Sequence, residues 1–337
     1  MPLPALALPI IALVVGFITL VWSADRFLSG AAATANNFGV SKMLIGLTIV
    51  SLGTSAPEIL VSLAAAIDGT PLLAVGNAIG SNITNIGLVL GVTAIMAPLP
   101  FSQAVLRSEL PWLLGATSLA LLLLFDLNLS RLDGILLLSA LGLIMYRLVL
   151  SQLNPRDDFA GDEVIAALED ELDDLPELTT GRALTWLGIG LLVLVGSAEL
   201  LVWAATEIAV ALNVDDMVIG LTIVAIGTSL PELAATVGSA LKGDPDIAIG
   251  NVVGSNILNI LAVLAVPGLV AATDITTLAL WRDAGMMLAV TLMLALFAYA
   301  INSQPVITRF EGVVLVAAWI GYTLVLIEQV RQTAPSL

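Results

Sequence analysis

Residues 46–58 read GLTIVSLGTSAPE, and residues 220–232, 174 positions later, read GLTIVAIGTSLPE. The alignment continues without a gap from 46–86 to 220–260, and 22 of its 41 positions are identical. Each copy places a proline and an ionisable glutamate inside a run that is otherwise apolar. The chain therefore contains an internal duplication, and the same polar interruption occurs once in each half.

The composition around these motifs is that of a membrane protein. Of the 337 residues, 59% are hydrophobic and only 11% are charged, which is too apolar for a soluble domain of this size. A helix needs about 20 apolar residues to cross a bilayer. We expect ten such helices, near residues 4–25, 43–67, 72–96, 104–125, 132–151, 182–210, 216–241, 246–271, 278–300 and 307–330.

The duplication predicts that the two halves lie in opposite orientations. Residues 1–151 form the first five-helix repeat and 182–337 the second, with the most similar parts, here called the α-repeats, at about 46–86 and 220–260. Because five is an odd number, the second copy enters the membrane from the opposite side. The expected fold is an all-α polytopic membrane protein with ten transmembrane helices in two inverted five-helix repeats.

The start of the fifth helix in each half has its own local signal. SRLDG at 130–134 and TRFEG at 308–312 each place a hydroxyl three residues before an acid. This spacing predicts an N-capping box, in which the two side chains satisfy each other's backbone N–H groups.

Residues 152–181 connect the two halves as an acidic linker. Between Asp157 and Glu177 there are ten acidic residues and no basic one. A run of like charges is typical of a solvated connection. Attraction of cations, or regulatory calcium binding, is the alternative interpretation.

The basic residues predict the orientation in the membrane. If the N-terminus lies outside, eight of the eleven Lys and Arg residues fall on the cytoplasmic side and three outside, as the positive-inside rule requires. We therefore expect a multi-pass protein of the inner (cytoplasmic) membrane, with both termini outside (periplasmic) and the linker 152–181 cytoplasmic.

The repeated motif interrupts its helix and gathers oxygen atoms. Pro57 has no amide hydrogen, so its helix is kinked and the carbonyl of Gly53 loses its partner. Thr54 and Glu58 share one helix face because they are four residues apart, and Ser55 lies beside them. The second copy repeats this arrangement with Gly227, Thr228, Ser229, Pro231 and Glu232.

The third and eighth helices supply polar residues opposite this motif. Asn77, Ser81 and Asn85 are spaced by four in GNAIGSNITNI. Asn251, Ser255 and Asn259 match them in GNVVGSNILNI, and both segments carry glycines that allow close helix approach. An alternative for Asn77, Asn82, Asn251 and Asn256 is that they only form hydrogen bonds between helices.

The potential ligands are all oxygen atoms. The chain has no cysteine and no histidine, which excludes disulfides, thiolate or imidazole metal sites and histidine-dependent catalysis. Carboxylate, hydroxyl, amide and carbonyl oxygens suit hard cations such as calcium and sodium. Glu58 and Glu232 together balance one divalent ion, and no basic residue lies in their spans. Without a cation, two such carboxylates would instead hold a proton, so protons are a competing ligand.

GTSAPE and GTSLPE, each followed by GNxxGSNIxN, resemble the paired α-repeats of the cation/calcium exchanger superfamily, which includes the sodium/calcium exchangers. The resemblance covers essentially the whole chain and is greatest for the compact bacterial inner-membrane branch. It implies a ten-helix antiporter with four central ion sites, at which calcium and sodium compete while helices 1 and 6 slide across the rest.

The resemblance also implies which residues bind the ions. The acids are Glu58 and Glu232, and the chain has Asn259 where several exchangers carry an aspartate, which leaves the sodium stoichiometry open and argues against potassium dependence. The full implied set is Glu58, Glu232, Thr54, Ser55, Thr228, Ser229, Ser81, Ser255, Asn85 and Asn259, with the backbone carbonyls of Ser51 and Ala225.

The expected function is secondary active antiport of calcium for sodium by alternating access. A proton-coupled calcium exchanger is the nearest alternative, and a passive cation channel is a third. Intramembrane proteolysis would require a histidine, so we expect no enzyme. We expect no cofactor, no nucleic acid and no obligatory protein partner; the partners are the calcium and sodium ions and the lipid bilayer.

Overall fold

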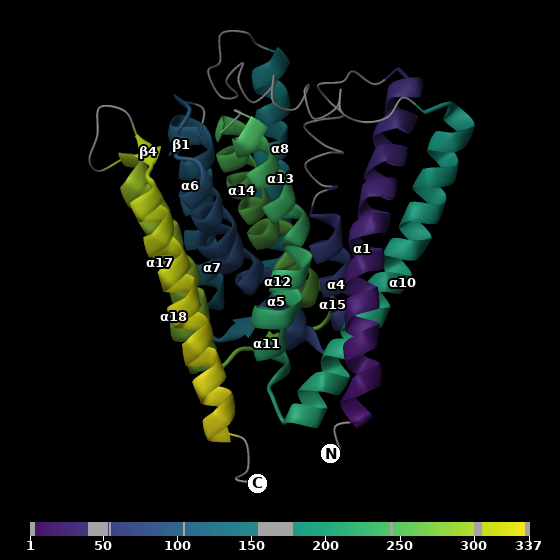
Figure 1. Ribbon diagram of the computed structural model, residues 1–337, viewed down its shortest axis with the longest axis vertical. Helices are drawn as coiled ribbons and strands as arrows, with labels where there is room; N and C mark the ends of the chain where they lie inside the picture. Colours follow the sequence, from purple (N-terminus) through teal and green to yellow (C-terminus); the bar gives the residue numbers. More distant parts are fainter. Residues whose placement is uncertain are drawn as a thin grey trace.

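The computed structural model describes residues 4–39, 53, 55–103, 105–153, 178–242, 245–299 and 305–333. These ranges form a bundle of long helices with both chain termini at one end (Figure 1). The end of α8 and the start of α10, between which the acidic linker runs, lie at the other end. The acidic stretch 157–177, residues 43–52 of the second expected span, and the expected site positions Ser51 and Thr54 lie outside the described residues.

The first half contains α-helices, two stretches of π-helix (η2 and η3) and two short strands. Its elements are α1 (Pro4–Asn37), α4 (Ala56–Ile67), α5 (Pro71–Thr84), η2 (Asn85–Leu90), α6 (Gly91–Met96), β1 (Leu99–Pro100), η3 (Val105–Glu109), α7 (Leu110–Leu124), β2 (Asn128–Leu129) and α8 (Arg131–Leu153).

The second half repeats the order of these ten elements and contains four further short helical segments without a counterpart in the described residues of the first half. Its elements are α10 (Thr180–Leu212), α11 (Asp216–Ile219), η4 (Gly220–Val224), α12 (Ala225–Thr228), α13 (Leu230–Lys242), α14 (Pro245–Leu258), η5 (Asn259–Val263), α15 (Ala265–Val270), β3 (Thr273–Asp274), α16 (Thr277–Ala279), η6 (Leu280–Ala284), α17 (Gly285–Tyr299), β4 (Val306–Ile307) and α18 (Arg309–Thr333).

Helices in the described residues are long and apolar enough to cross a membrane. Six meet this description on their own, and a seventh is the bent pair Asp216–Thr228 and Leu230–Leu241. The segments Pro71–Met96 and Ala248–Val270 are largely buried inside the protein, whereas α1, α10 and α18 expose many apolar side chains. The central segments are thus enclosed by helices whose outer faces suit lipid.

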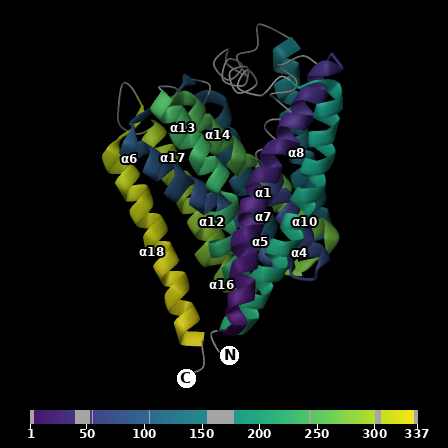
Figure 2. The same cartoon turned by 45° about the vertical axis from the view of Figure 1, so that its right-hand side comes forward.

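The helix α1 is longer than the sequence analysis predicted. It spans 34 residues and ends at Asn37 rather than near residue 25, a length of about 50 Å at the usual helical rise. The extra turns have a partner, because α10 is 33 residues long and runs antiparallel beside α1 in both views (Figures 1 and 2). The two helices support each other over nearly their whole length.

Two equivalent close contacts join α1 and α10. In one a glycine of α1 meets a side chain of α10, and in the other a glycine of α10 meets a residue of α1. A Cβ atom added to Gly16 would lie 2.9 Å from Cγ of Leu201, and one added to Gly190 would lie 2.5 Å from the backbone nitrogen of Phe27. Gly190 follows Gly16 by 174 positions, and Leu201 follows Phe27 by the same interval. Equivalent residues therefore exchange partners, which is the signature of a two-fold relation between the halves.

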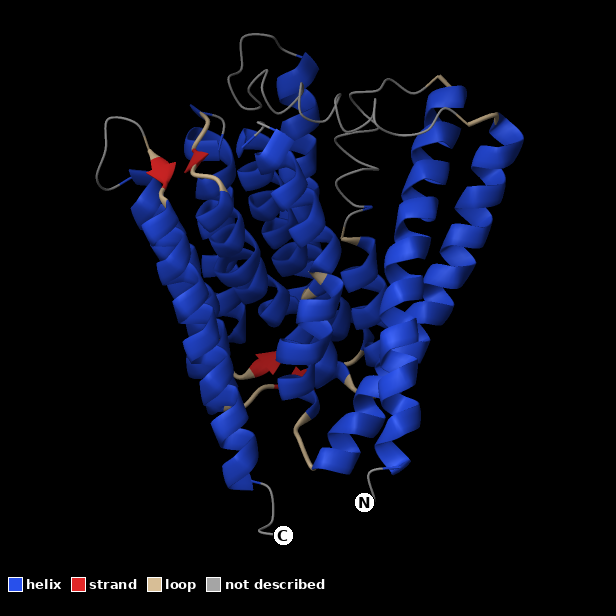
Figure 3. Ribbon diagram, in the orientation of Figure 1, coloured by secondary structure: helices blue, strands red, loops and turns tan. Residues whose placement is uncertain are grey.

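The strands are also exchanged between the halves. Strand β1 pairs with β4 and β2 pairs with β3, both antiparallel, and Figure 3 shows the two pairs toward opposite ends of the bundle. Since β3 follows β1 by 174 positions, β3 is the counterpart of β1, and each strand of the first half pairs with the counterpart of the other strand of that half. The halves are therefore interlocked rather than laid side by side.

Both expected N-capping boxes are confirmed. The Asp133 carboxylate accepts hydrogen bonds from the backbone N–H and the hydroxyl of Ser130, at 2.7 and 2.6 Å. Glu311 accepts the same two bonds from Thr308, at 2.7 and 2.8 Å. Each box fixes the start of the fifth long helix of its half.

The α1–α10 contact predicts different outcomes for two glycines on α10. Gly190→Ala should lower the thermal unfolding temperature in detergent, because the added methyl group would press on the backbone of Phe27 and overpacking costs about 1–3 kcal/mol. Gly188→Ala is the matched control, since this glycine is exposed and a Cβ there has nothing within 4 Å. Equal melting temperatures for the two variants would contradict the close contact.

Candidate functional site

The site is built at breaks in the two helices that carry the repeated motif. Helices α12 and α13 meet at Ser229 with a bend of 42°, and Pro231 lies in the first turn of α13. In the first half α4 begins at Ala56, directly after Ser55, with Pro57 in its first turn. The prolines thus mark the starts of two half-helices, as their missing amide hydrogens predict.

Glu58 and Glu232 occupy equivalent places in these half-helices. Each lies in the first helical turn, where the positive end of the helix dipole favours a carboxylate. Their exposed fractions are 0% and 2%, and neither carboxylate has a hydrogen-bond partner among the described residues. The two groups are close enough to interact electrostatically, so a charge on one buried carboxylate disfavours a charge on the other.

The half-helix that carries each glutamate packs against a π-helical stretch of the opposite half. Helix α4, which carries Glu58, packs against η5, which begins at Asn259. Helix α13, which carries Glu232, packs against η2, which begins at Asn85. The structure therefore brings the two motifs together across the two-fold relation, and the π-helical stretches that widen the turn begin at the facing asparagines.

Unpartnered polar atoms are concentrated at this place. Of fifteen buried side-chain nitrogen and oxygen atoms without a hydrogen bond in the described part of the chain, eleven belong to the two motifs and the facing helices. Buried polar groups are normally paired, and an orphaned set indicates a ligand. The eleven atoms are Oγ of Ser55, Ser81 and Ser229, both carboxylate oxygens of Glu58 and Glu232, Oδ1 of Asn82 and Asn85, and Oδ1 and Nδ2 of Asn259.

The remaining expected ligands differ in how free their oxygens are. Ser255 is buried, with 3% exposed. Thr228 is also buried, and its hydroxyl donates to Oδ1 of Asn77 at 3.3 Å and to the Ala225 carbonyl at 3.4 Å. The Ala225 carbonyl additionally accepts the backbone N–H of Ser229 at 3.1 Å. To bind a cation it would have to give up one of these bonds, because a carbonyl oxygen has two lone pairs.

Asparagines outside the expected ligand set link the helices. Asn77 donates to the Ser62 hydroxyl at 3.0 Å and to the Glu58 carbonyl at 3.3 Å. In the second half Asn251 donates to the Thr236 hydroxyl at 3.3 Å. These bonds agree with the interhelical interpretation of Asn77 and Asn251, and they hold the facing helix against the half-helix that carries each glutamate.

Asn256 also forms hydrogen bonds between helices, as its interhelical interpretation predicts, and its partners are residues of the first half. It accepts a hydrogen bond from Nδ2 of Asn85 at 3.1 Å and donates to the Asn82 carbonyl at 3.3 Å. Asn82 and Asn256 are equivalent residues, 174 positions apart, so their meeting places them beside the two-fold axis. The repeat offset was the available signal, because a residue on such an axis must meet its own counterpart.

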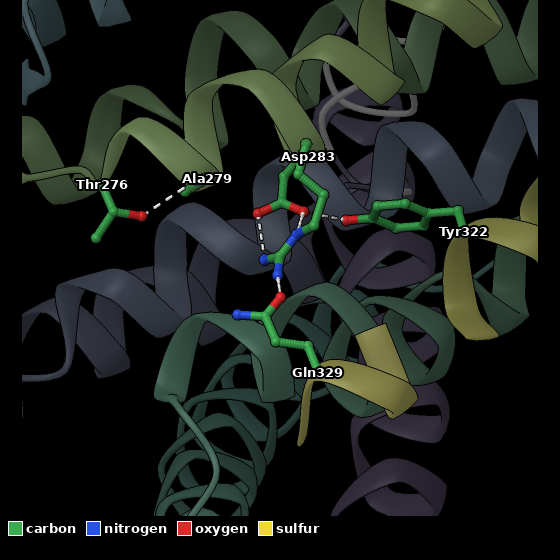
Figure 4. A network of polar contacts seen from close by, with 6 residues as sticks. Thr276, Ala279, Asp283, Tyr322 and Gln329 are labelled. Atoms are coloured by element: carbon green, nitrogen blue, oxygen red, sulfur yellow. Dashed lines mark hydrogen bonds and ion pairs between the residues drawn. The ribbon is translucent and has the colours of Figure 1, made fainter. Parts of the chain in front are cut away.

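Asp283 on η6 is a buried carboxylate with partners, in contrast to Glu58 and Glu232. It is fully buried, and Arg282 donates to its two oxygens at 2.6 and 2.7 Å while the Tyr322 hydroxyl donates at 2.8 Å. Figure 4 shows this group with Gln329 of α18, which accepts from Arg282. Glu58 and Glu232 lack any such compensation among the described residues, so their charges are available to a bound cation.

The chemistry of the site is that of a hard cation bound largely by neutral oxygens. Within the described ranges no cluster of three or more His, Cys, Asp or Glu side chains could hold a metal ion. Carboxylate, serine and asparagine oxygens are of the type that calcium, which takes six to eight oxygen ligands, and sodium prefer.

Comparison with known proteins places this geometry in a family. The sequence profile described as "Sodium/calcium exchanger protein" matches residues 8–150 and 182–328. CaxA of Alkalimonas amylolytica is 45% identical over 316 residues, which cover 94% of this chain and 98% of CaxA. The inner membrane protein YrbG of Escherichia coli strain K12 is 39% identical over 315 residues, covering 93% and 95% of the two chains.

Solved structures of the sodium-calcium exchanger NCX_Mj have a similar fold. The structure soaked with sodium and calcium superposes with a TM-score of 0.60 and 33% sequence identity. The superposition covers 93% of this chain and 97% of NCX_Mj. The likeness thus extends over both halves of the chain.

The site predicts that each glutamate is required for binding of a divalent cation. Glu58→Gln and Glu232→Gln should each weaken calcium binding about 100-fold or more, because removing one buried charge partner costs about 3–5 kcal/mol. Isothermal titration of the purified protein with calcium measures this. Glu199→Gln is the control, since Glu199 is exposed; folded glutamine variants that bind calcium as the unsubstituted protein does would refute the site.

Proposed function

Because the chain belongs to the sodium/calcium exchanger family, we propose that it is a secondary active antiporter that exchanges calcium for sodium by alternating access. The family binds and exchanges these two ions, and the chain is a transporter rather than an enzyme. The observation that carries the proposal is that the carboxylates of Glu58 and Glu232 are buried and have no partner side chain among the described residues. When both are ionised, their combined negative charge balances the positive charge of one calcium ion or of two sodium ions.

The proposed ligands are the oxygens that the two motifs and the facing helices contribute. The unpartnered atoms of Ser55, Ser81 and Ser229 support this assignment. The full proposed set is Glu58, Glu232, Thr54, Ser55, Thr228, Ser229, Ser81, Ser255, Asn85, Asn259 and the carbonyls of Ser51 and Ala225.

Competition for one set of carboxylates couples the two ions. When calcium occupies the site, the charges of Glu58 and Glu232 are balanced, so a sodium ion gains little by entering as well. When sodium ions enter instead, they supply the same total charge and allow calcium to leave. With neither ion bound, the two buried carboxylates lack a counter-charge unless they take up protons, and this disfavours a change of the access side.

We further propose ten transmembrane helices in two inverted repeats, residues 1–151 and 182–337, joined by the acidic linker 152–181. The reciprocal contacts of α1 with α10 and the exchanged strand pairs support an inverted relation. The helices η3–α7 and α8, which are predominantly apolar, provide the fourth and fifth spans of the first half.

The chain is a multi-pass membrane protein, and its relative YrbG is an inner membrane protein. We propose the same membrane here, with both termini periplasmic and the linker cytoplasmic, on the distribution of basic residues.

The orientation can be checked because the chain has no cysteine of its own. Ala160→Cys in the linker should resist a membrane-impermeant thiol reagent in intact cells and react in inside-out vesicles. Ser336→Cys near the C-terminus should show the opposite pattern and serves as the matched control. Labelling of Ala160→Cys in intact cells would overturn the proposed orientation.

The coupling ion is tested by calcium flux into proteoliposomes under an imposed gradient. An outward sodium gradient should drive uptake of radioactive calcium, whereas a pH gradient or a potassium gradient of the same size should not. A sodium gradient should drive uptake because two sodium ions balance the charges of the two glutamates, as one calcium ion does.

The alternatives give different results in the same assay. Uptake driven only by the pH gradient would establish proton coupling, which two buried carboxylates also permit. Calcium entry at equal rate without any counter-ion gradient would establish a passive channel. Glu58→Gln vesicles provide the baseline for leak.

A further inference from the structure

Four buried asparagines around the two-fold relation are bonded asymmetrically. Asn82, Asn85, Asn256 and Asn259 all have exposed fractions of 0% or 1%, and they form two equivalent pairs at the repeat offset of 174. Asn256 reaches across to the first half, where it accepts from Nδ2 of Asn85 at 3.1 Å and donates to the Asn82 carbonyl at 3.3 Å.

The counterpart bonds of the second half are not made. Symmetry would have Asn82 donate to the Asn256 carbonyl, but its Nδ2 instead turns back to the Ala78 carbonyl of its own helix, at 2.8 Å. Symmetry would also have Oδ1 of Asn82 accept from Nδ2 of Asn259, yet both of these atoms lack a partner among the described residues. Asn256 thus bonds to residues of the opposite half, whereas its equivalent Asn82 bonds to its own helix.

This difference decides which amide oxygen is held ready for a cation. A side-chain amide presents either its oxygen or its N–H₂ group, and only the oxygen can bind a cation. The bond from Nδ2 of Asn85 to Asn256 fixes that amide and leaves Oδ1 of Asn85 unpartnered. Asn259 has no bond on either amide atom within the described residues, so its orientation is not fixed.

A second asymmetry accompanies the first. A Cβ atom added to Gly53 would lie 2.5 Å from Leu28, and one added to the equivalent Gly227 would lie 1.9 Å from the ring of Phe17. Both partners belong to α1, although a symmetric arrangement would place one of these glycines against α10. The outer helix pair and the inner asparagines therefore depart from symmetry together, as they should in one of two alternative access conformations.

We propose that Asn256 and Asn82 are alternating positioning residues for the transported cation. In the conformation described here Asn256 orients the amide oxygen of Asn85, and in the conformation open to the other side Asn82 does the same for Asn259. The exchange uses chemically equivalent bonds, so neither conformation is favoured by the asparagines themselves. This inference rests on the proposed function of alternating calcium access.

The test is calcium transport measured separately from each membrane face, in right-side-out and inside-out vesicles. Asn256→Ala should raise the KM for calcium about fivefold at one face, as expected for loss of one hydrogen bond, and leave the KM at the other face within about twofold. Asn82→Ala should give the same change at the opposite face. A purely structural role would lower the maximal rate or the yield without this dependence on the face.

Asn251→Ala is the control, because Asn251 bonds Thr236 within its own half and its loss should affect both faces equally. If an alanine variant does not fold, Asn256→Ser and Asn82→Ser replace it, since serine fits the same space. Equal changes at both faces, or changes at the same face for both variants, would overturn the inference while the proposed antiport stands. Absence of calcium exchange in the unsubstituted protein would overturn both.

Discussion

Two carboxylates buried without a basic partner in the described part of the chain impose the constraint on which this structure depends. Glu58 and Glu232 can remain charged in a dry interior only if something positive binds there, whereas Asp283 carries its own compensation from Arg282 and Tyr322. Each glutamate lies in the first turn of a half-helix, near buried serine and asparagine oxygens. The surrounding apolar helices separate the two carboxylates from the lipid. The described part of the interior therefore leaves these two acids without a counter-charge, as a site for a cation would.

Because of the duplication, one sequence motif present in two copies forms both sides of this centre. Each half contributes one glutamate-bearing half-helix and one π-helical stretch that begins at an asparagine. Neither half alone could place them together, because α4 packs against η5 and α13 packs against η2 across the two-fold relation. Departures from symmetry then become informative. Asn82 and Asn256 have identical chemistry and different bonds, so the difference reports the conformation of the whole molecule and not the sequence at either position.

The sequence predicted the features that are local or repeated. The prolines located the helix breaks, the hydroxyl–acid spacing at Ser130 and Thr308 located two helix starts, and the offset of 174 paired Glu58 with Glu232. What it could not give were bonds that depend on how helices rotate against each other, such as Asn85 to Asn256, and the π-helical turns that begin at Asn85 and Asn259. The length of α1 was missed because its final turns are stabilised by α10 and not by their own apolarity.

The reciprocal contact between α1 and α10 has a consequence for how the protein can diversify. Gly16 meets Leu201 at one end of the helix pair, and Gly190 meets Phe27 at the other. While the halves were identical, any change to the contact would have altered both ends at once. Because leucine and phenylalanine now occupy equivalent positions, the two contacts enclose side chains of different volume. A substitution at one contact can therefore change the packing there without altering the other contact.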